Sequence, residues 1–254
     1  MRIACIHAHP DDAEILAGGT LALLATLGHQ ITIVTMTAGD CGSGTFSAGE
    51  ISAVRKAEAA ASAALIKAEY RCAGFWDLSI FDNDESRRKV TGVLRELRPD
   101  IVLTASPSDY LCDHEATSRL VRDACFTASV PNYTTPTPQS ALAAIPSLYF
   151  LDPIGQMDRS GEIVTPDFTI DIASTFATKT AMLARHKSQR AWLKQQHGLD
   201  DYLRQMEDWT RACGVRAGVV FGEGFRHYKV HPYPHEPVLQ RILAAHVVNA
   251  SRKL

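Results

Sequence analysis

The densest group of chemically useful side chains in this chain is His9-Pro10-Asp11-Asp12, which follows the apolar run Ile3–Ile6 and precedes a helical pattern. One histidine and two carboxylates therefore lie in a single turn between a strand and a helix. Imidazole nitrogen and carboxylate oxygen are ligands of catalytic zinc, and such sites use three protein ligands and keep one position for water. The motif can supply two of these ligands, so a third must come from elsewhere in the chain.

His114 is the best candidate for the third ligand. It stands at the start of another helical pattern, shortly after the buried-looking strand 101–104. In a doubly wound sheet of strand order 3-2-1-4-5, strands 1 and 4 are neighbours and the loops that follow them diverge, which leaves a crevice at their carboxyl ends. Both loops would face this crevice. The sequence therefore predicts a metal bound by His9, by a carboxylate of the same turn and by His114. If Asp12 binds the metal, Asp11 is left free as a base near the bound water.

These residues resemble the LmbE-like (PIG-L) zinc deacetylases, which include the N-acetylglucosaminyl-phosphatidylinositol de-N-acetylases. The matching segments follow the order of that family: Ala8–Glu14, Gly18–Thr20, Thr37–Asp40, Arg55–Ala59, Arg98–Asp100, Asp113-His114 and, more briefly, Lys179, His186–Gln189 and Glu223–Phe225. The resemblance implies that His9, Asp12 and His114 bind zinc or another divalent metal and that Asp11 is the general base. It also implies that Arg55 and Asp77 contact a sugar, as the corresponding positions do in some members.

One position departs from the family pattern. Many members carry a histidine three residues before the last metal ligand, where it stabilises the tetrahedral intermediate, whereas this chain has Leu111. We predict that Tyr110 or His186 takes over this role, because a phenol or an imidazole can donate a hydrogen bond to an oxyanion. Loss of one such donor typically costs about 10²- to 10³-fold in rate, so the departure weakens the case for catalysis without abolishing it.

Several polar residues near the motifs have a structural alternative to a functional role. Arg55 lies three residues before Glu58 on one helix, so the two could form a surface ion pair. Asp40, in a glycine-rich turn, is predicted either to contact the substrate or to cap the turn. Asp113 is expected to cap the helix that begins at His114, to orient His114, or to do both.

Two further sets of histidines are expected to lie outside the catalytic ligands. His7, on the first strand, is interpreted as a core residue or as a group that supports the metal ligands. His227, His231 and His235 are spaced by four, but Pro232, Pro234 and Pro237 exclude a helix there. We interpret this segment as a surface or subunit-contact segment rather than a second metal site, which leaves homo-oligomerisation open.

Composition narrows the class of protein. The 254 residues are 46% hydrophobic and 21% charged, which fits one domain that spans residues 1–254. A net charge of −2 without a basic block disfavours nucleic-acid binding.

The six scattered cysteines are expected to be reduced thiols of a cytoplasmic protein. The first residues are too short an apolar segment for a signal peptide, and no stretch of about 18 apolar residues predicts a membrane span, so we expect a small-molecule substrate rather than a membrane or a nucleic acid.

The order of apolar runs and helical patterns predicts the fold. Strands at 3–6, 31–35, 70–74 and 101–104 alternate with helices at 14–27, 50–67, 85–97 and 114–129. This alternation predicts an α/β fold with a Rossmann-like three-layer, doubly wound, mostly parallel sheet of order 3-2-1-4-5. Strands at 147–151 and 168–172, helices at 173–191 and 195–213, the apolar run 219–221 and a loop at 222–224 would form a C-terminal helical and strand elaboration. The loops at 39–49 and 131–146 are expected to border the crevice and to choose the substrate.

The predicted function is that of a zinc-dependent deacetylase that removes an acyl group, with acetyl as the expected group, from the amide nitrogen of an amino sugar or a related small molecule. The alternative is a non-catalytic module that binds a metal or a small molecule on the same fold, which Leu111 would favour. Dinucleotide binding is disfavoured, because the first turn lacks G-x-G-x-x-G and places carboxylates where a pyrophosphate needs backbone amides.

Overall fold

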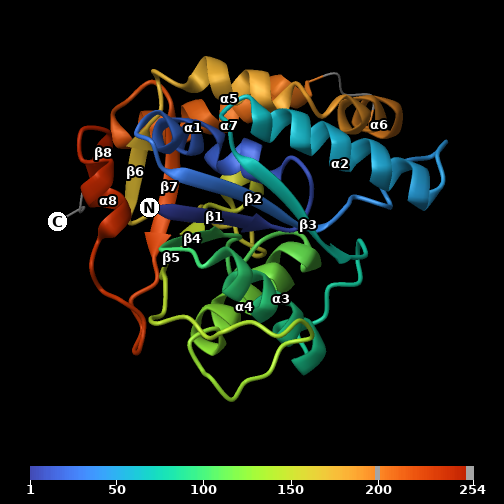
Figure 1. Cartoon of the computed structure of the whole chain (residues 1–254). Coiled ribbons are helices and arrows are strands. Elements are labelled where there is room, and N and C mark those ends of the chain that lie inside the picture. The colour runs from blue at the N-terminus through green and yellow to red at the C-terminus, as the bar shows by residue number, and fades with distance from the viewer. Residues whose placement is uncertain (198–200, 250–254) are drawn as a thin grey trace.

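A computed structural model describes residues 1–197 and 201–249 of the chain. Their strands form one eight-stranded sheet of order β3-β2-β1-β4-β5-β7-β6-β8 (Figure 1). The strands are β1 (Arg2–His7), β2 (Gln30–Thr37), β3 (Glu69–Phe75), β4 (Ile101–Thr104), β5 (Ser147–Leu151), β6 (Phe168–Asp171), β7 (Gly222–His227) and β8 (Val247–Asn249). Strands β1 to β5 pair in parallel, and the other three extend the sheet in antiparallel pairs. The predicted core order 3-2-1-4-5 is confirmed.

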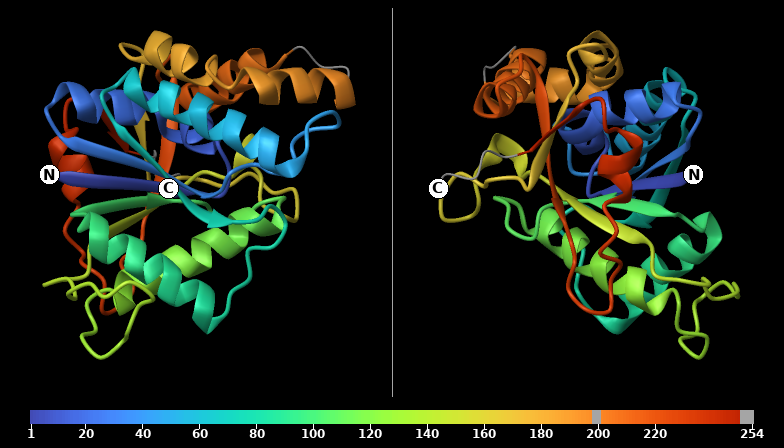
Figure 2. Two further views of the ribbon diagram at one scale, coloured as in Figure 1. Left: turned by 45° about the vertical axis from the view of Figure 1, so that its right-hand side comes forward. Right: turned by 90° about the vertical axis from the view of Figure 1, so that its left-hand side faces the viewer.

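Helices cover both faces of the sheet, which makes three layers (Figures 1 and 2). One face carries α1 (Asp12–Thr26), α2 (Ala48–Ala64), α5 (Phe176–Leu183), α6 (Lys187–His197) and α7 (Tyr202–Ala217). The other carries α3 (Asp84–Leu97) and α4 (Cys112–Thr127), while the short α8 (Val238–Ile242) lies near β8. Within the described ranges, no helix is both long enough and apolar enough to cross a bilayer.

Two apolar cores lie on the two faces of the sheet, and β1 contributes to both. Ile3 and Cys5 pack into the core beneath α1, whereas Ala4 and Ile6 pack into the core beneath α3 and α4. A strand buried on both faces has no polar side to show, so its sequence is a continuous apolar run. This is the reason that β1, β4 and β5 could be predicted from short apolar segments.

The glycine-rich loop after β2 ends at a well-formed helix start. Ser47 Oγ accepts a hydrogen bond from the backbone N–H of Glu50, and the Glu50 carboxylate accepts one from the N–H of Ser47. This reciprocal capping box fixes the first turn of α2. Arg55 lies two turns further along the same helix, so the cap also helps to place its guanidinium.

The C-terminal elaboration differs in detail from the prediction. Residues 222–224, predicted as a loop, begin strand β7, and β8 was not predicted at all. The predicted helix 173–191 is divided into α5 and α6, and the predicted helix 195–213 is replaced by the end of α6 and by α7, with residues 198–200 outside the described part. Glycine indicated a loop at the start of β7, but in the structure it allows close packing. A Cβ on Gly222 would lie 2.6 Å from Thr169 Cγ2, and one on Gly214 would lie 2.9 Å from the Gly222 nitrogen. Close packing of α7 on β7 requires both glycines.

Asp152, just after β5, is a buried carboxyl group on the same side of the fold. Its Oδ1 is buried without a hydrogen bond, and a Cβ on Gly224 of β7 would lie 2.1 Å from its Oδ2. Burial raises the pKa of Asp152 to about 6, although the charges of Arg226 and Arg216 oppose the increase. The folded protein therefore binds this proton more tightly than the unfolded chain does.

We expect the Asp152→Asn substitution to stabilise the protein in a pH-dependent way. A folded pKa above the unfolded value contributes stability below roughly pH 4 that is lost as the pH rises through about 6. A difference of about two pKa units corresponds to about 3 kcal/mol. The free energy of unfolding of the variant should therefore exceed that of wild type by up to this amount at about pH 8 and by little at about pH 4. Urea unfolding of both proteins in chelator would measure this, with the exposed Asp208→Asn as control. An equal difference at both pH values would assign the effect to packing instead.

Candidate metal centre and catalytic site

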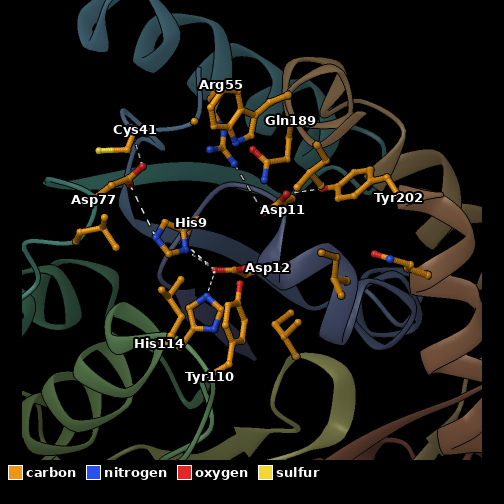
Figure 3. A pocket seen from close by; sticks show the side chains of 18 of the residues that line it. His9, Asp11, Asp12, Cys41, Arg55, Asp77, Tyr110, His114, Gln189 and Tyr202 are labelled. Carbon is orange, nitrogen blue, oxygen red and sulfur yellow. Dashed lines mark hydrogen bonds and ion pairs between the residues drawn. The ribbon is translucent and has the colours of Figure 1, made fainter. Parts of the chain in front are cut away.

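The side chains predicted to do chemistry meet in one cavity of about 340 Å³ at the carboxyl ends of β1 and β4 (Figure 3). His9, Asp11 and Asp12 come from the turn between β1 and α1, and His114 comes from the first turn of α4. These are the two loops that the strand order placed on one crevice. The C-terminal helices form another wall, with Gln189, Trp192, Leu193, Tyr202, Gln205 and Trp209.

Two of the predicted ligands, His9 and His114, both approach one carboxylate oxygen of the third, Asp12. Asp12 Oδ2 lies 3.3 Å from His9 Nδ1 and 3.4 Å from His114 Nε2. Ligands held about 2.0–2.2 Å from a tetrahedral zinc lie roughly 3.3–3.5 Å from one another. Both distances are therefore those of neighbouring ligands. His114 Nε2 is also buried without a hydrogen bond, which suits a nitrogen whose lone pair faces a cation.

His7 is a second histidine beside Asp12. Among the residues that the structure describes, the ligand atoms of His7, Asp12 and His114 lie within 4.8 Å of one another, as do those of His9, Asp77 and Asp113. His7 Nδ1 is 2.7 Å from Asp12 Oδ2, which is a hydrogen-bond distance and shorter than the separation of two ligands of one metal. His7 thus orients Asp12, in agreement with the supporting role that we predicted for it.

In each predicted histidine ligand, one ring nitrogen faces Asp12 and the other lies near a second carboxylate. His9 turns Nδ1 toward Asp12 and places Nε2 3.1 Å from Asp113 Oδ2. His114 turns Nε2 toward Asp12 and places Nδ1 3.1 Å from Asp109 Oδ1. Histidines that bind a metal usually donate their second ring N–H to a carboxylate or a carbonyl, which fixes the tautomer. The donor set and its surroundings therefore fit a divalent metal.

Asp113 takes neither of the roles that we expected for it. The N-cap of α4 receives no side-chain hydrogen bond, and Asp113 contacts His9 rather than His114. Its Oδ2 also accepts a 2.7 Å hydrogen bond from the backbone N–H of Leu78. Asp109, which our sequence analysis missed, orients His114 instead. A carboxylate five residues before the histidine, in the loop after β4, was the available signal.

The carboxylates hold positive charge at the centre of the site. Burial would lower the pKa of His9, but hydrogen bonds to Asp113 and Asp12 outweigh it and raise the value to about 9. Burial would also lower the pKa of His114, but the negative charges of Asp12 and Asp109 outweigh it and raise the value to about 10. Metal binding replaces such protons, because histidine ligands must be neutral. A site that stabilises two imidazolium ions is suited to a divalent cation.

Asp11 lies beside the predicted metal ligands, and its carboxylate is contacted by Tyr202 and Arg55 rather than by the histidines. Its backbone has φ 103°, in the left-handed region, and its side chain does not cap α1. The hydroxyl of Tyr202 donates a hydrogen bond to Asp11 Oδ2, and Arg55 Nη2 lies 3.9 Å from Oδ1. Burial raises the pKa of Asp11, Arg55 lowers it and the charge of Asp12 raises it further. No sequence signal could have indicated Tyr202, which is separated from Asp11 by 191 positions.

Arg55 reaches the cavity from α2, so the surface ion pair that we had left open does not form. Its Nη2 donates a 3.0 Å hydrogen bond to the carbonyl oxygen of Pro10, while Glu58 accepts hydrogen bonds from Ser188. Gly39 has φ +74°, and a Cβ there would lie 2.3 Å from Arg55 Nη1. Arg55 Nε is buried without a hydrogen bond, so the guanidinium keeps a donor for a ligand.

Of the two aspartates predicted to contact substrate, one lines the cavity. Asp77 does so, and its Oδ1 is buried without a hydrogen bond, 3.9 Å from His9 Nε2. Asp40 does not line it. Its Oδ1 instead accepts a 2.9 Å hydrogen bond from the backbone N–H of Asp77, whose Oδ2 accepts one from the N–H of Cys41. Asp40 therefore ties the loop after β2 to the loop after β3, which corrects our expectation.

The two predicted oxyanion donors have different surroundings. Tyr110 lines the cavity with Leu111, its ring centroid is 5.5 Å from that of His114, and Figure 3 shows its hydroxyl end directed toward Asp12. His186 is buried outside the cavity lining, with Nε2 3.1 Å from Glu14 Oε1. A buried carboxylate needs a partner, and His186 serves Glu14. The expectation that His186 contacts the oxyanion is therefore corrected.

Other predicted features lie away from the cavity. Loop 131–146 does not line it, contrary to our expectation, whereas Cys41 and Gly42 of the 39–49 loop do. In the described part of the chain, His227, His231 and His235 belong to no group that could hold a metal. All six cysteines are free thiols.

Comparisons with known proteins agree with this geometry. The PIG-L family model, described as GlcNAc-PI de-N-acetylase, matches residues 4–125. The 1D-myo-inositol 2-acetamido-2-deoxy-alpha-D-glucopyranoside deacetylase of Rhodococcus erythropolis is 26% identical over 241 residues, which cover 74% of this chain and 81% of that protein.

Two solved structures share the fold. The N,N'-diacetylchitobiose deacetylase of Pyrococcus horikoshii has a TM-score of 0.76 at 23% identity, covering 93% of this chain and 88% of that one. The 4-carboxy-2-hydroxymuconate hydratase of Pseudomonas putida KT2440 has a TM-score of 0.75 at 23% identity, covering 93% and 99%. Since these two proteins catalyse different reactions, the fold by itself does not determine the chemistry. The family match includes the His-Pro-Asp-Asp turn and His114, and it confirms the resemblance predicted from the motifs: residues 4–125 of the chain are similar to the PIG-L family.

Proposed function

We propose that this chain is a metal-dependent deacetylase that hydrolyses the amide bond of an N-acetylated amino sugar or of a small molecule that contains one. The observation that carries the proposal is the convergence of His9, Asp12 and His114 beside the separate carboxylate of Asp11. The Rhodococcus relative, named for an acetamido sugar, supports the substrate class. We propose zinc as the metal, because two histidines and one carboxylate are a donor set of catalytic zinc.

The residues around the metal have distinct roles in this proposal. Zinc bound by the three ligands would supply Lewis acidity toward water and toward the amide carbonyl. Asp11 accepts the proton of the attacking water and returns a proton to the amine nitrogen as the C–N bond breaks. The unpaired donor of Arg55 and the unpaired acceptor of Asp77 bind hydroxyl groups of the substrate.

Purified protein and a panel of N-acetylated sugars test this function. We expect release of free amine from N-acetylglucosamine, diacetylchitobiose or N-acetylglucosaminyl-inositol, loss of the activity with a chelator, and its recovery with added zinc. Metal analysis of the same sample gives the number of ions per chain. Bound metal without hydrolysis of any amide would contradict a deacetylase and favour the non-catalytic binding module.

We expect Tyr110→Phe to lower kcat about 10²-fold with little change in KM, since an oxyanion donor acts mainly in the transition state. Tyr110 is exposed, so its hydroxyl contributes little to folding. Steady-state kinetics measure the effect, with Tyr133→Phe, a half-buried tyrosine outside the cavity, as the matched control. A change in KM alone would assign Tyr110 to substrate binding.

A further inference from the structure

Tyr202 links the C-terminal helices to the catalytic turn. It is the first residue of α7 and is 7% exposed, and its hydroxyl donates a hydrogen bond to Asp11 Oδ2. Figure 3 shows the phenol ring reaching Asp11 from the side of the cavity away from His9. The contact joins the family-matched segment, residues 4–125, to a helix outside it.

The two oxygens of Asp11 have unequal surroundings. Tyr202 donates a hydrogen bond to Oδ2. Among the ion pairs of the described residues, Arg55 Nη2 approaches Oδ1 to 3.9 Å, which is beyond hydrogen-bond distance. Arg55 is instead hydrogen-bonded to the carbonyl oxygen of Pro10. Because Asp11 does not cap α1, its own helix does not fix the orientation of its carboxylate either.

We propose that Tyr202 is the positioning residue of the general base: it holds Asp11 Oδ2 and thereby presents Oδ1 to the attacking water. The inference rests on the proposed role of Asp11 in amide hydrolysis. It assigns a catalytic purpose to the C-terminal elaboration, since the first half of the chain contains the metal ligands and the base but not the group that orients the base.

The effect of removing the hydroxyl follows from this geometry. A base that samples several orientations spends less time in the productive one, and displacement of a reacting group by about 1 Å can cost 10²-fold in rate. We therefore expect Tyr202→Phe to lower kcat about 10- to 100-fold. KM and metal content should stay at wild-type values, because Tyr202 acts through Asp11 rather than through the substrate or the ligands.

A double-mutant cycle separates this role from a general structural one. Tyr202→Phe is compared with wild type and, in the Asp11→Asn background, with Asp11→Asn alone. If Tyr202 acts through Asp11, the second comparison should show no further loss. The matched control is Tyr149→Phe, which removes a buried phenol that donates to Gln240 and should leave kcat unchanged.

Each outcome bears on the proposal. An unchanged kcat in Tyr202→Phe, a change in KM alone, or an equal loss in both backgrounds would overturn it. Absence of hydrolysis by zinc-loaded wild-type protein would contradict the proposed function instead. A measurement without turnover then decides the inference: crystal structures of the zinc-loaded proteins should show one Asp11 rotamer in wild type and several in Tyr202→Phe, and a single unchanged rotamer in the variant would refute the positioning role.

Discussion

The substitution Asp11→Asn is expected to leave the metal content at the wild-type level and to lower amide hydrolysis by about 10³-fold, within the range typical of a lost general base. An amide has nearly the shape of a carboxylate and can still accept the hydrogen bond from Tyr202, but it cannot take a proton from water. The structure separates this role from metal binding, because Asp12 Oδ2 is the oxygen on which His9 and His114 converge.

Metal analysis and kcat should be measured on one preparation of the Asp11→Asn variant. Asp208→Asn, a change at an exposed aspartate outside the cavity, is the matched control and should resemble wild type in both properties. Near-normal hydrolysis by Asp11→Asn would place the base elsewhere. Loss of the metal would instead make Asp11 a ligand.

His114→Ala is expected to weaken metal binding by at least about 100-fold and to abolish hydrolysis in metal-limited buffer. Loss of a residue that merely supports a ligand already costs about 10- to 100-fold in affinity, and His114 is one of three predicted ligands. The change also leaves Asp109 Oδ1 without its partner, but Asp109 Oδ2 still accepts a hydrogen bond from the backbone N–H of Ile154.

Equilibrium dialysis against zinc, followed by metal analysis, measures this effect. His235→Ala removes an exposed histidine that belongs to no metal-binding group in the described part of the chain, and it should retain zinc like wild type. Wild-type metal content in His114→Ala would refute the ligand assignment. Recovery of hydrolysis at high zinc concentration would support it, because a weakened site fills by mass action.

The sequence alone determined the parts of the site that depend on local order. His9, Asp11 and Asp12 share one turn, so their proximity needed no tertiary information. The apolar run of β4 predicted that His114, in the segment that follows it, lies beside that turn, because adjacent parallel strands bring their carboxyl ends to one edge. Strands buried on both faces are continuous apolar segments, and this made β1, β4 and β5 predictable.

The tertiary structure decided which partner each polar side chain meets. His186 has the chemistry of an oxyanion donor, but α1 brings Glu14 against it, and a buried carboxylate is stabilised only when it is paired. Asp113 precedes His114 in the chain, yet it faces His9, while Asp109 faces His114. The contact of Tyr202 with Asp11 depends on how α7 packs on β7, where Gly214 and Gly222 permit a close approach. Such pairings arise from the packing of distant elements, so spacing along the chain carries no record of them.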